Sequence, residues 1–194
     1  MTAPWLQTLP GADAMRAAVA AAIPVIETDR LRLRAPRADD WPALEEIWTS
    51  DRAVHFGGPV SAEDGWLDFC QMVAGWTLRG VGYFTVEDRS TGVVRGFIGL
   101  NHEWGDAELE LGWLLTADAE GMGYGAEAAG AVRDWAFGTL GLSTVVSYVD
   151  TANHRSQALA RRIGGVVDSR AAMTGPNDDG QTIVFRHTRK EAAR

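Results

Sequence analysis

Three alternating glycines, Gly121, Gly123 and Gly125, stand directly before an alanine-rich stretch in the sequence AEGMGYGAEAA, residues 119–129. The alanines predict a helix that begins after the last glycine. The first N–H groups of a helix have no partner inside it, and the helix dipole places partial positive charge there. Because glycine has no side chain that would block an approach, this pattern favours capture of an anion such as a phosphate.

Taken alone, the glycine loop has two other interpretations. Residues 121–126 fit G-x-G-x-x-A, the dinucleotide fingerprint, and Asp150 lies near where a ribose-binding acid would follow. Against this, TADAE separates the preceding strand from Gly121, and too few residues follow Asp150 to complete a doubly wound sheet. A plain chain reversal is the third interpretation. A nucleoside-triphosphatase P-loop is excluded, because the loop contains no lysine.

Composition narrows the class of protein. The chain has 194 residues, 46% of them apolar, which suits one domain of ordinary size. A net charge of −8 argues against broad nucleic-acid binding, which needs a basic surface. We expect no membrane association, because the sequence has no apolar run of 18 residues. The single cysteine, Cys70, allows no internal disulfide, and its apolar neighbours predict a buried side chain in a cytoplasmic protein.

The order of predicted elements indicates an α/β (α+β) fold with a mixed, mostly antiparallel sheet. About four helices flank it, and the segment 108–150 predicts one parallel strand–helix–strand unit. Residues 1–24 are expected to form an N-terminal extension with a short helix, and residues 25–190 the domain. The seven predicted strands are residues 25–36, 83–88, 93–103, 108–115, 143–150, 165–173 and 182–189.

Several separated segments, in register, resemble the GNAT superfamily of N-acetyltransferases, and within it the RimJ/RimL-type branch. The likeness spans residues 25–189. It implies the GNAT fold, an N-acetyltransferase domain over 25–190, and acetyl-CoA as co-substrate. The matching segments are ETDRLRLRAPRADDW, HFGGP, GVGYFTVEDRSTGVVRGFIGL, ELGWLL, EGMGYGAEAA and DTANHRSQALARRIGG.

The resemblance implies where coenzyme A binds. The diphosphate loop of the family, R/Q-x-x-G-x-G/A, maps onto residues 120–125, with Glu120 in place of the first Arg or Gln. The implied diphosphate contacts are the backbone groups of Gly121, Met122, Gly123, Tyr124, Gly125 and Ala126. The implied pantetheine contacts are the backbone of Trp113, Leu114 and Leu115, and the side chain of Asn153. Ser156 would lie near the sulfur.

Transfer of the acetyl group by direct attack needs a base, and Glu110 is the best candidate. Strand alternation predicts that Glu108 and Glu110 share one face of the segment 108–115. Two close carboxylates raise each other's proton affinity, which suits removal of a proton from an amine. Glu108 is the alternative base. Otherwise one or both carboxylates are solvated strand residues.

Candidates remain for the general acid, for contact with the acceptor and for a metal site. Many superfamily members carry a tyrosine that acts as the general acid, four residues past the serine position. This chain has Ala160 there, so the general acid is Ser156 or a water, or the reaction uses none. Asn153 is also explained as the cap of its helix. His55 lies in the loop that would border the acceptor site, or is a plain surface histidine. The four histidines have no spacing that suits a metal, so we predict none.

These observations predict an acetyl-CoA-dependent N-acetyltransferase that acts on a primary amine. The acceptor is a protein N-terminus or a small-molecule amine, and no motif chooses between them. A homodimer is compatible with such a fold, although no residue pattern indicates one. The alternative is a non-catalytic acyl-CoA-binding module, which would keep the glycine loop and Asn153 but lack a usable base.

Overall fold

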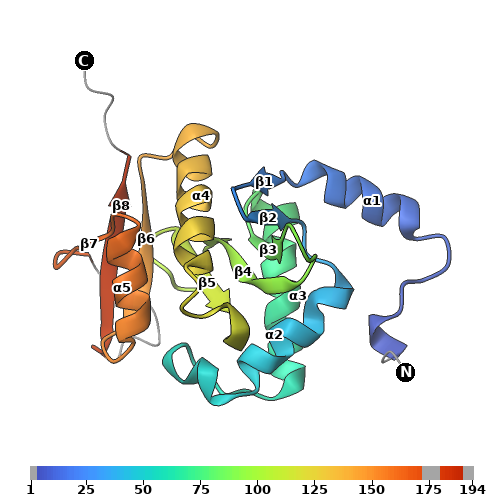
Figure 1. Ribbon diagram of the computed structural model, residues 1–194, viewed down its shortest axis with the longest axis horizontal. Coiled ribbons are helices and arrows are strands. Elements are labelled where there is room, and N and C mark those ends of the chain that lie inside the picture. The colour runs from blue at the N-terminus through green and yellow to red at the C-terminus, as the bar shows by residue number, and fades with distance from the viewer. Residues whose placement is uncertain (1–3, 172–179, 190–194) are drawn as a thin grey trace.

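An eight-stranded sheet organises the computed structural model, which describes residues 4–171 and 180–189 (Figure 1). The strand order is β1-β2-β3-β4-β5-β6-β8-β7, and every described pair is antiparallel except β5 with β6. The strands are β1 (Ile26–Glu27), β2 (Leu31–Arg34), β3 (Tyr83–Asp88), β4 (Val94–Asn101), β5 (Glu110–Leu115), β6 (Thr144–Asp150), β7 (Val166–Val167) and β8 (Thr182–Thr188).

Five α-helices accompany the sheet: α1 (Asp13–Ala22), α2 (Trp41–Trp48), α3 (Ala62–Arg79), α4 (Tyr124–Gly138) and α5 (His154–Arg162). Four short 3₁₀ helices also occur in the described residues: η1 (Pro4–Leu6), η2 (Ala38–Asp40), η3 (Asp51–His55) and η4 (Ala117–Ala119). The predicted mixed, mostly antiparallel fold is confirmed, as is the parallel pairing across the segment 108–150.

The strand predicted over residues 25–36 is two antiparallel strands, which is why the sheet has eight strands. The chain reverses between β1 and β2, where the Thr28 N–H donates to the Leu31 carbonyl at 2.9 Å. Within the predicted strand 165–173, only Val166 and Val167 form β structure among the described residues. Most of the predicted loop 175–180 lies outside the described residues.

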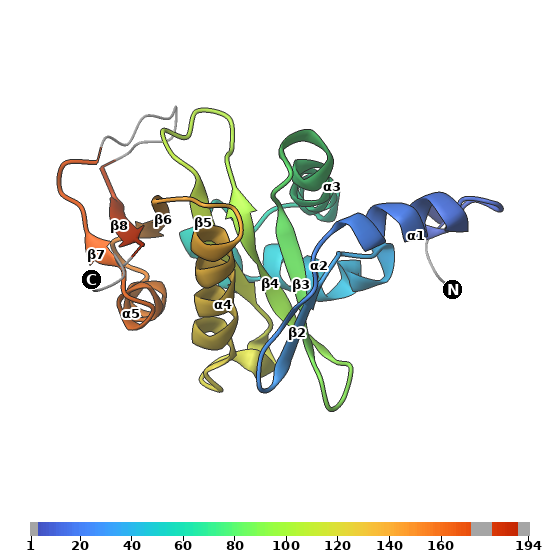
Figure 2. The same ribbon diagram turned by 90° about the horizontal axis from the view of Figure 1, so that it is seen from above.

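Helices cover both faces of the sheet, with α4 and α5 on one side and α2 and α3 on the other (Figure 2). The alternation of strand side chains produces this layering, because successive residues point to opposite faces. On the α4 side the sheet contributes Phe84, Ile98 and Leu111. On the α2 and α3 side it contributes Tyr83, Phe97 and Leu114.

The prediction that the Cys70 side chain is buried is wrong. Cys70 is exposed, not buried, because α3 packs through Phe69, Met72 and Trp76, and the residue after Phe69 turns away from that face. Helix α1 stands off the body and has no buried residue (Figures 1 and 2). Within residues 4–171 and 180–189, no helix combines the length and apolarity that a membrane crossing requires.

A buried ion pair joins the sheet to the start of α2. Both nitrogens of the Arg34 fork donate to the Asp40 carboxylate at 2.8 Å, and both side chains are almost fully buried. Asp40 also accepts from the Arg37 N–H and the Thr85 hydroxyl, each at 2.8 Å. Asp40, the N-cap of α2, therefore anchors the start of the segment that continues through α2 into η3.

We predict that Asp40→Ala lowers the free energy of unfolding by about 3 to 5 kcal/mol, because it leaves the Arg34 charge buried without this partner. Urea denaturation measures the loss. The control is Asp13→Ala, which removes an exposed pair with Arg16 and should change stability by less than about 0.5 kcal/mol. A loss of under about 1 kcal/mol in Asp40→Ala would contradict the anchoring role.

Candidate active site

Strands β5 and β6 pair at one register position and then part. Glu110 lies opposite Val146, and beyond this point side chains replace backbone partners. The Ser147 hydroxyl donates to the Leu111 carbonyl at 2.7 Å. The Tyr148 N–H donates to the Glu110 carboxylate at 3.4 Å. Glu110 therefore lies at the closed end of a gap that widens toward the carboxyl ends of both strands.

The backbone of β5 faces this gap at every second residue. The Thr116 N–H donates to the Arg95 carbonyl at 3.1 Å, so the even-numbered residues face β4 and the odd-numbered residues face β6. The Leu115 carbonyl accepts from Arg52 at 2.8 Å. The N–H and C=O of Trp113 face the gap, and no strand of the described chain pairs with them there. An extended ligand with amide groups can bind them.

The glycine turn leaves a row of free donors at the start of α4. Gly121 and Gly123 have φ of +73° and +81°, and Gly123 is the helix N-cap without a side-chain cap. The first backbone bond of the helix runs from the Glu127 N–H to the Gly123 carbonyl at 3.1 Å. Among the described residues, no acceptor binds the N–H groups of residues 121–126.

The glycines have different roles. Gly121 and Gly123 supply left-handed backbone that other residues adopt at a cost. At Gly125, an added Cβ would lie 2.7 Å from a Leu159 methyl and 2.9 Å from a Leu115 methyl. Gly125 therefore allows α4 to approach β5 and α5 closely, whereas the other two shape the turn.

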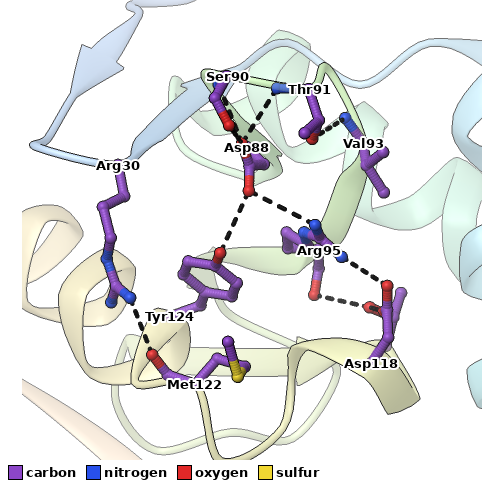
Figure 3. A network of polar contacts seen from close by, with 10 residues as sticks. Arg30, Asp88, Ser90, Thr91, Val93, Arg95, Asp118, Met122 and Tyr124 are labelled. Atoms are coloured by element: carbon purple, nitrogen blue, oxygen red, sulfur yellow. Dashed lines mark hydrogen bonds and ion pairs between the residues drawn. The ribbon is translucent and has the colours of Figure 1, made fainter.

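The side chain of Tyr124, the first residue of α4, anchors the glycine turn to the sheet (Figure 3). Its buried ring lies between two guanidinium groups, with Arg30 at 4.5 Å and Arg95 at 5.6 Å from the ring centroid. The Tyr124 hydroxyl donates to the Asp88 carboxylate at 3.2 Å. The helix start is thus fixed to β3 and β4 through one side chain.

Arg30 extends this clamp to the turn itself. It donates to the Met122 carbonyl at 3.0 Å (Figure 3). It also donates to the Glu127 carboxylate at 2.7 Å. The Ser90 hydroxyl, followed by neighbouring N–H groups, holds the pKa of the Asp88 carboxyl well below its usual range. Asp88 is therefore ionised at neutral pH, as its contact with Arg95 requires.

Glu120 stands where the family pattern has Arg or Gln, and two arginines neutralise it. Its carboxylate accepts from Arg52 of η3 at 2.6 Å and from Arg155 of α5 at 2.5 Å. The three side chains together carry a net positive charge. The substitution at residue 120 therefore does not make this end of the site anionic.

A cavity of about 1080 Å³ connects these features. Its walls are the end of β5, the glycine turn, the start of α5, and a segment from α2 through η3. The predicted coenzyme A residues that line it are Trp113, Leu114, Leu115, Gly121, Gly123, Gly125, Ala126, Asn153 and Ser156. Met122 and Tyr124 do not line it, and neither does Glu110.

Glu110 is half-buried, and burial raises its pKa to about 8, with a further contribution from Glu103 and Asp106. The sequence-based reason for a raised pKa was wrong in one respect, because Glu108 is not the like charge responsible. Arg186 binds Glu108 at 2.6 and 2.7 Å, and these hydrogen bonds lower the pKa of the Glu108 carboxyl. The like charges come from the β4–β5 connection instead.

Tyr83 is a site neighbour that the sequence analysis missed. Its hydroxyl lies where a Cβ at Gly112 would be, 2.1 Å from the ideal position. The residue is buried, and burial followed by the Glu110 charge raises the pKa of the Tyr83 hydroxyl well above the usual value. The available signal was Gly112, because a glycine inside an apolar strand often marks a close approach.

Asn153 and Ser156 lie together at the start of α5. The Asn153 side chain accepts from the Ser156 N–H at 3.0 Å, so Asn153 caps the helix as expected. The Trp113 indole N–H donates to the Ser156 hydroxyl oxygen at 3.2 Å. The Ser156 O–H hydrogen is therefore free to donate elsewhere. Ala160 is fully buried and does not line the cavity.

His55 lines the cavity and pairs with a carboxylate, its Nδ1 lying 3.1 Å from an Asp150 oxygen. His187 is buried in the sheet, where burial lowers its pKa to about 4. Over residues 4–171 and 180–189, no group of three His, Cys, Asp or Glu side chains could hold a metal ion. The absence of a metal requirement stays a prediction.

Both the sequence and the fold are similar to those of known proteins. Residues 30–166 match the family described as "Acetyltransferase (GNAT) domain". YnaD, an uncharacterised N-acetyltransferase of Bacillus subtilis, is 27% identical over 141 residues, which cover 72% of this chain and 81% of that protein. A solved acetyltransferase from Agrobacterium tumefaciens is 43% identical with a TM-score of 0.80, covering 86% of this chain and 95% of its own. RimL, a ribosomal-protein α-N-acetyltransferase solved with coenzyme A, is similar in fold alone, at 17% identity and a TM-score of 0.66 over 85% of this chain and 98% of its own.

The raised pKa of Glu110 predicts a cost in stability at alkaline pH. Between its ordinary value near 4.5 and about 8, the folded protein binds more protons than the unfolded chain, so stability is lost as pH rises through this window. We expect Glu110→Gln to remove this loss. The free energy of unfolding of the variant minus that of wild type should therefore be at least about 1 kcal/mol larger at pH 8.5 than at pH 5. Urea denaturation at both pH values measures it, and parallel curves would contradict the buried environment.

Proposed function

The chain belongs to the GNAT acetyltransferase family, and from this premise we propose that it moves an acetyl group from acetyl-CoA to a primary amine by direct attack in a ternary complex. The observation that carries the proposal is the set of free N–H groups at residues 121–126. Four of these residues, Gly121, Gly123, Gly125 and Ala126, line the cavity that also reaches Trp113 at the β5–β6 gap. Free helix-start amides suit a diphosphate, and the gap suits an arm with amide groups.

Each wall of the cavity has a part in holding acetyl-CoA. The glycine turn binds the diphosphate, and the cationic group formed by Arg52, Glu120 and Arg155 adds attraction for the phosphates. The Trp113 backbone binds the amides of the pantetheine arm, and Asn153 contacts the same arm. The thioester then lies toward the closed end of the gap, near Glu110.

The chemistry requires the nitrogen to lose two protons. One proton goes to solvent, and the other replaces the acetyl group on sulfur. Glu110, with a pKa of about 8, accepts a proton from nitrogen as the carbonyl carbon is attacked. The free O–H of Ser156, oriented by Trp113, stabilises the departing thiolate.

The acceptor is a primary amine, either a protein N-terminus, as in RimL, or a small molecule. The RimJ/RimL-type branch remains part of this proposal, and so do the cytoplasmic location and a homodimeric state. Residues 25–190 are the unit to which we assign the activity. Binding of coenzyme A without turnover would favour the non-catalytic acyl-CoA-binding module instead.

Isothermal titration with coenzyme A tests the binding site. We predict that Gly123→Val weakens binding at least tenfold, because a β-branched residue is strongly disfavoured at φ +81° and the turn must change shape. The matched control is Gly130→Val on the same helix, where an added Cβ meets nothing within 4 Å. Equal affinity in the two variants would contradict a diphosphate site at the turn.

Steady-state acetylation of a panel of primary amines tests the base. We expect Glu110→Gln to lower kcat about 100-fold while KM for acetyl-CoA changes little, since the carboxylate acts on nitrogen and not on the cofactor. Glu108→Gln is the comparison, because Arg186 already holds that carboxylate. A larger loss in Glu108→Gln than in Glu110→Gln would transfer the assignment to Glu108.

A further inference from the structure

We propose that His55, held by Asp150, takes the first proton from the ammonium group of the acceptor inside the cavity, before the neutral amine attacks the thioester. This inference rests on the proposed function, and it names a second catalytic group that acts at an earlier step than Glu110.

The geometry of the pair suits proton acceptance. His55 Nδ1 lies 3.1 Å from Asp150 Oδ2. Because an ionised carboxylate only accepts hydrogen bonds, Nδ1 carries the hydrogen and Nε2 keeps its lone pair free. The carboxylate also stabilises the imidazolium that forms when Nε2 gains a proton. This is the arrangement by which an Asp orients and supports a histidine base.

Asp150 is itself fixed where β6 turns into α5. Its Oδ1 accepts from the Ala152 N–H at 2.6 Å, and its backbone carbonyl accepts from the Asn153 N–H at 2.9 Å. The Ala152 N–H and then His55 lower the pKa of the Asp150 carboxyl, so this group stays ionised. The histidine therefore has a rigid anionic partner.

The pair lies where the acceptor and acetyl-CoA would meet. His55 ends η3, which packs against α2, whereas Asp150 is the last residue of β6, the strand opposite β5 across the gap. His55 lines the same cavity as Asn153 and Ser156, which follow Asp150 by three and six residues. Glu110, by contrast, does not line the cavity.

Two proton acceptors match the two protons that nitrogen must lose. His55 Nε2 takes the first, which converts the ammonium to an amine, and passes it to solvent, since a third of the His55 side chain is exposed. The amine then forms a bond to the carbonyl carbon, and the C–S bond breaks. Glu110 takes the second proton and releases it through solvent to the thiolate, which becomes the thiol, so that both bases end the cycle unprotonated.

Other charged or titratable groups face the same cavity. They are Asp51, Arg52, Glu120, His154, Arg155 and Arg162. Arg52 and Arg155 are bound to Glu120, and among the described residues only Asp150 makes a hydrogen bond or ion pair with the His55 ring. Asp150 is therefore the one described charged group that contacts the His55 ring directly.

The test compares wild type with His55→Gln over pH 6.5 to 10, using full-length protein, acetyl-CoA and a reactive amine from the panel. A general base contributes about 100-fold, so kcat/KM for the amine should fall by that factor at pH 7. The loss should shrink toward pH 10, where a much larger fraction of the amine is neutral without help. Asp150→Asn, which keeps an acceptor but not the charge, should move the acidic limb of the rate profile to lower pH.

Two controls keep the outcome interpretable. His102→Gln alters a histidine outside the cavity, whose Nε2 lies 3.0 Å from the Asp106 carbonyl, and should leave the rate and profile unchanged. Coenzyme A affinity of His55→Gln, measured by titration, shows that the variant folds. A loss that is the same at every pH would assign His55 a structural role and overturn the inference, as would an unchanged rate. If wild type itself transfers no acetyl group, the proposed function fails and the inference fails with it.

Discussion

Beyond Leu111, strand β5 has a strand partner on one edge and, among the described residues, none on the other, and the rest of the site depends on this asymmetry. Backbone groups left without partners inside a protein are costly, so a sheet that opens must satisfy or expose them. Here the Ser147 hydroxyl and Arg52 satisfy two carbonyls of β5, and the Glu110 carboxylate accepts from the Tyr148 N–H of β6. The Trp113 backbone is left facing the cavity, which is what a ligand with amide groups requires.

The open gap is useful only if its far end can hold a charged group, and the fold provides this through the start of α4. The turn exposes its amides because the residues on either side of Gly123 are held by arginines. Arg30 binds the Met122 carbonyl, and the Tyr124 ring lies between Arg30 and Arg95. Positive charge beside the turn comes from η3 and α5, on either side of Glu120. The glycine turn, Arg52, Arg155 and His55 thus line one cavity.

The sequence predicted the features whose causes are local. A glycine turn before an alanine-rich helix and a strand with alternating faces both follow from backbone preferences of a few residues, and both are present. The β1–β2 reversal at Thr28 was missed because no Gly, Pro or Asn marks that turn. The pairs Arg52–Glu120 and His55–Asp150 join residues 68 and 95 positions apart, and no local pattern reveals such partners.

The central claim is that the amides at residues 121–126 bind the diphosphate of coenzyme A. Amide ¹H–¹⁵N spectra recorded during titration with coenzyme A, and separately with pantetheine, test it most directly. We predict large downfield shifts for Gly123, Tyr124, Gly125 and Ala126 with coenzyme A and none for these residues with pantetheine. If coenzyme A binds while these four amides keep their positions, the account is contradicted.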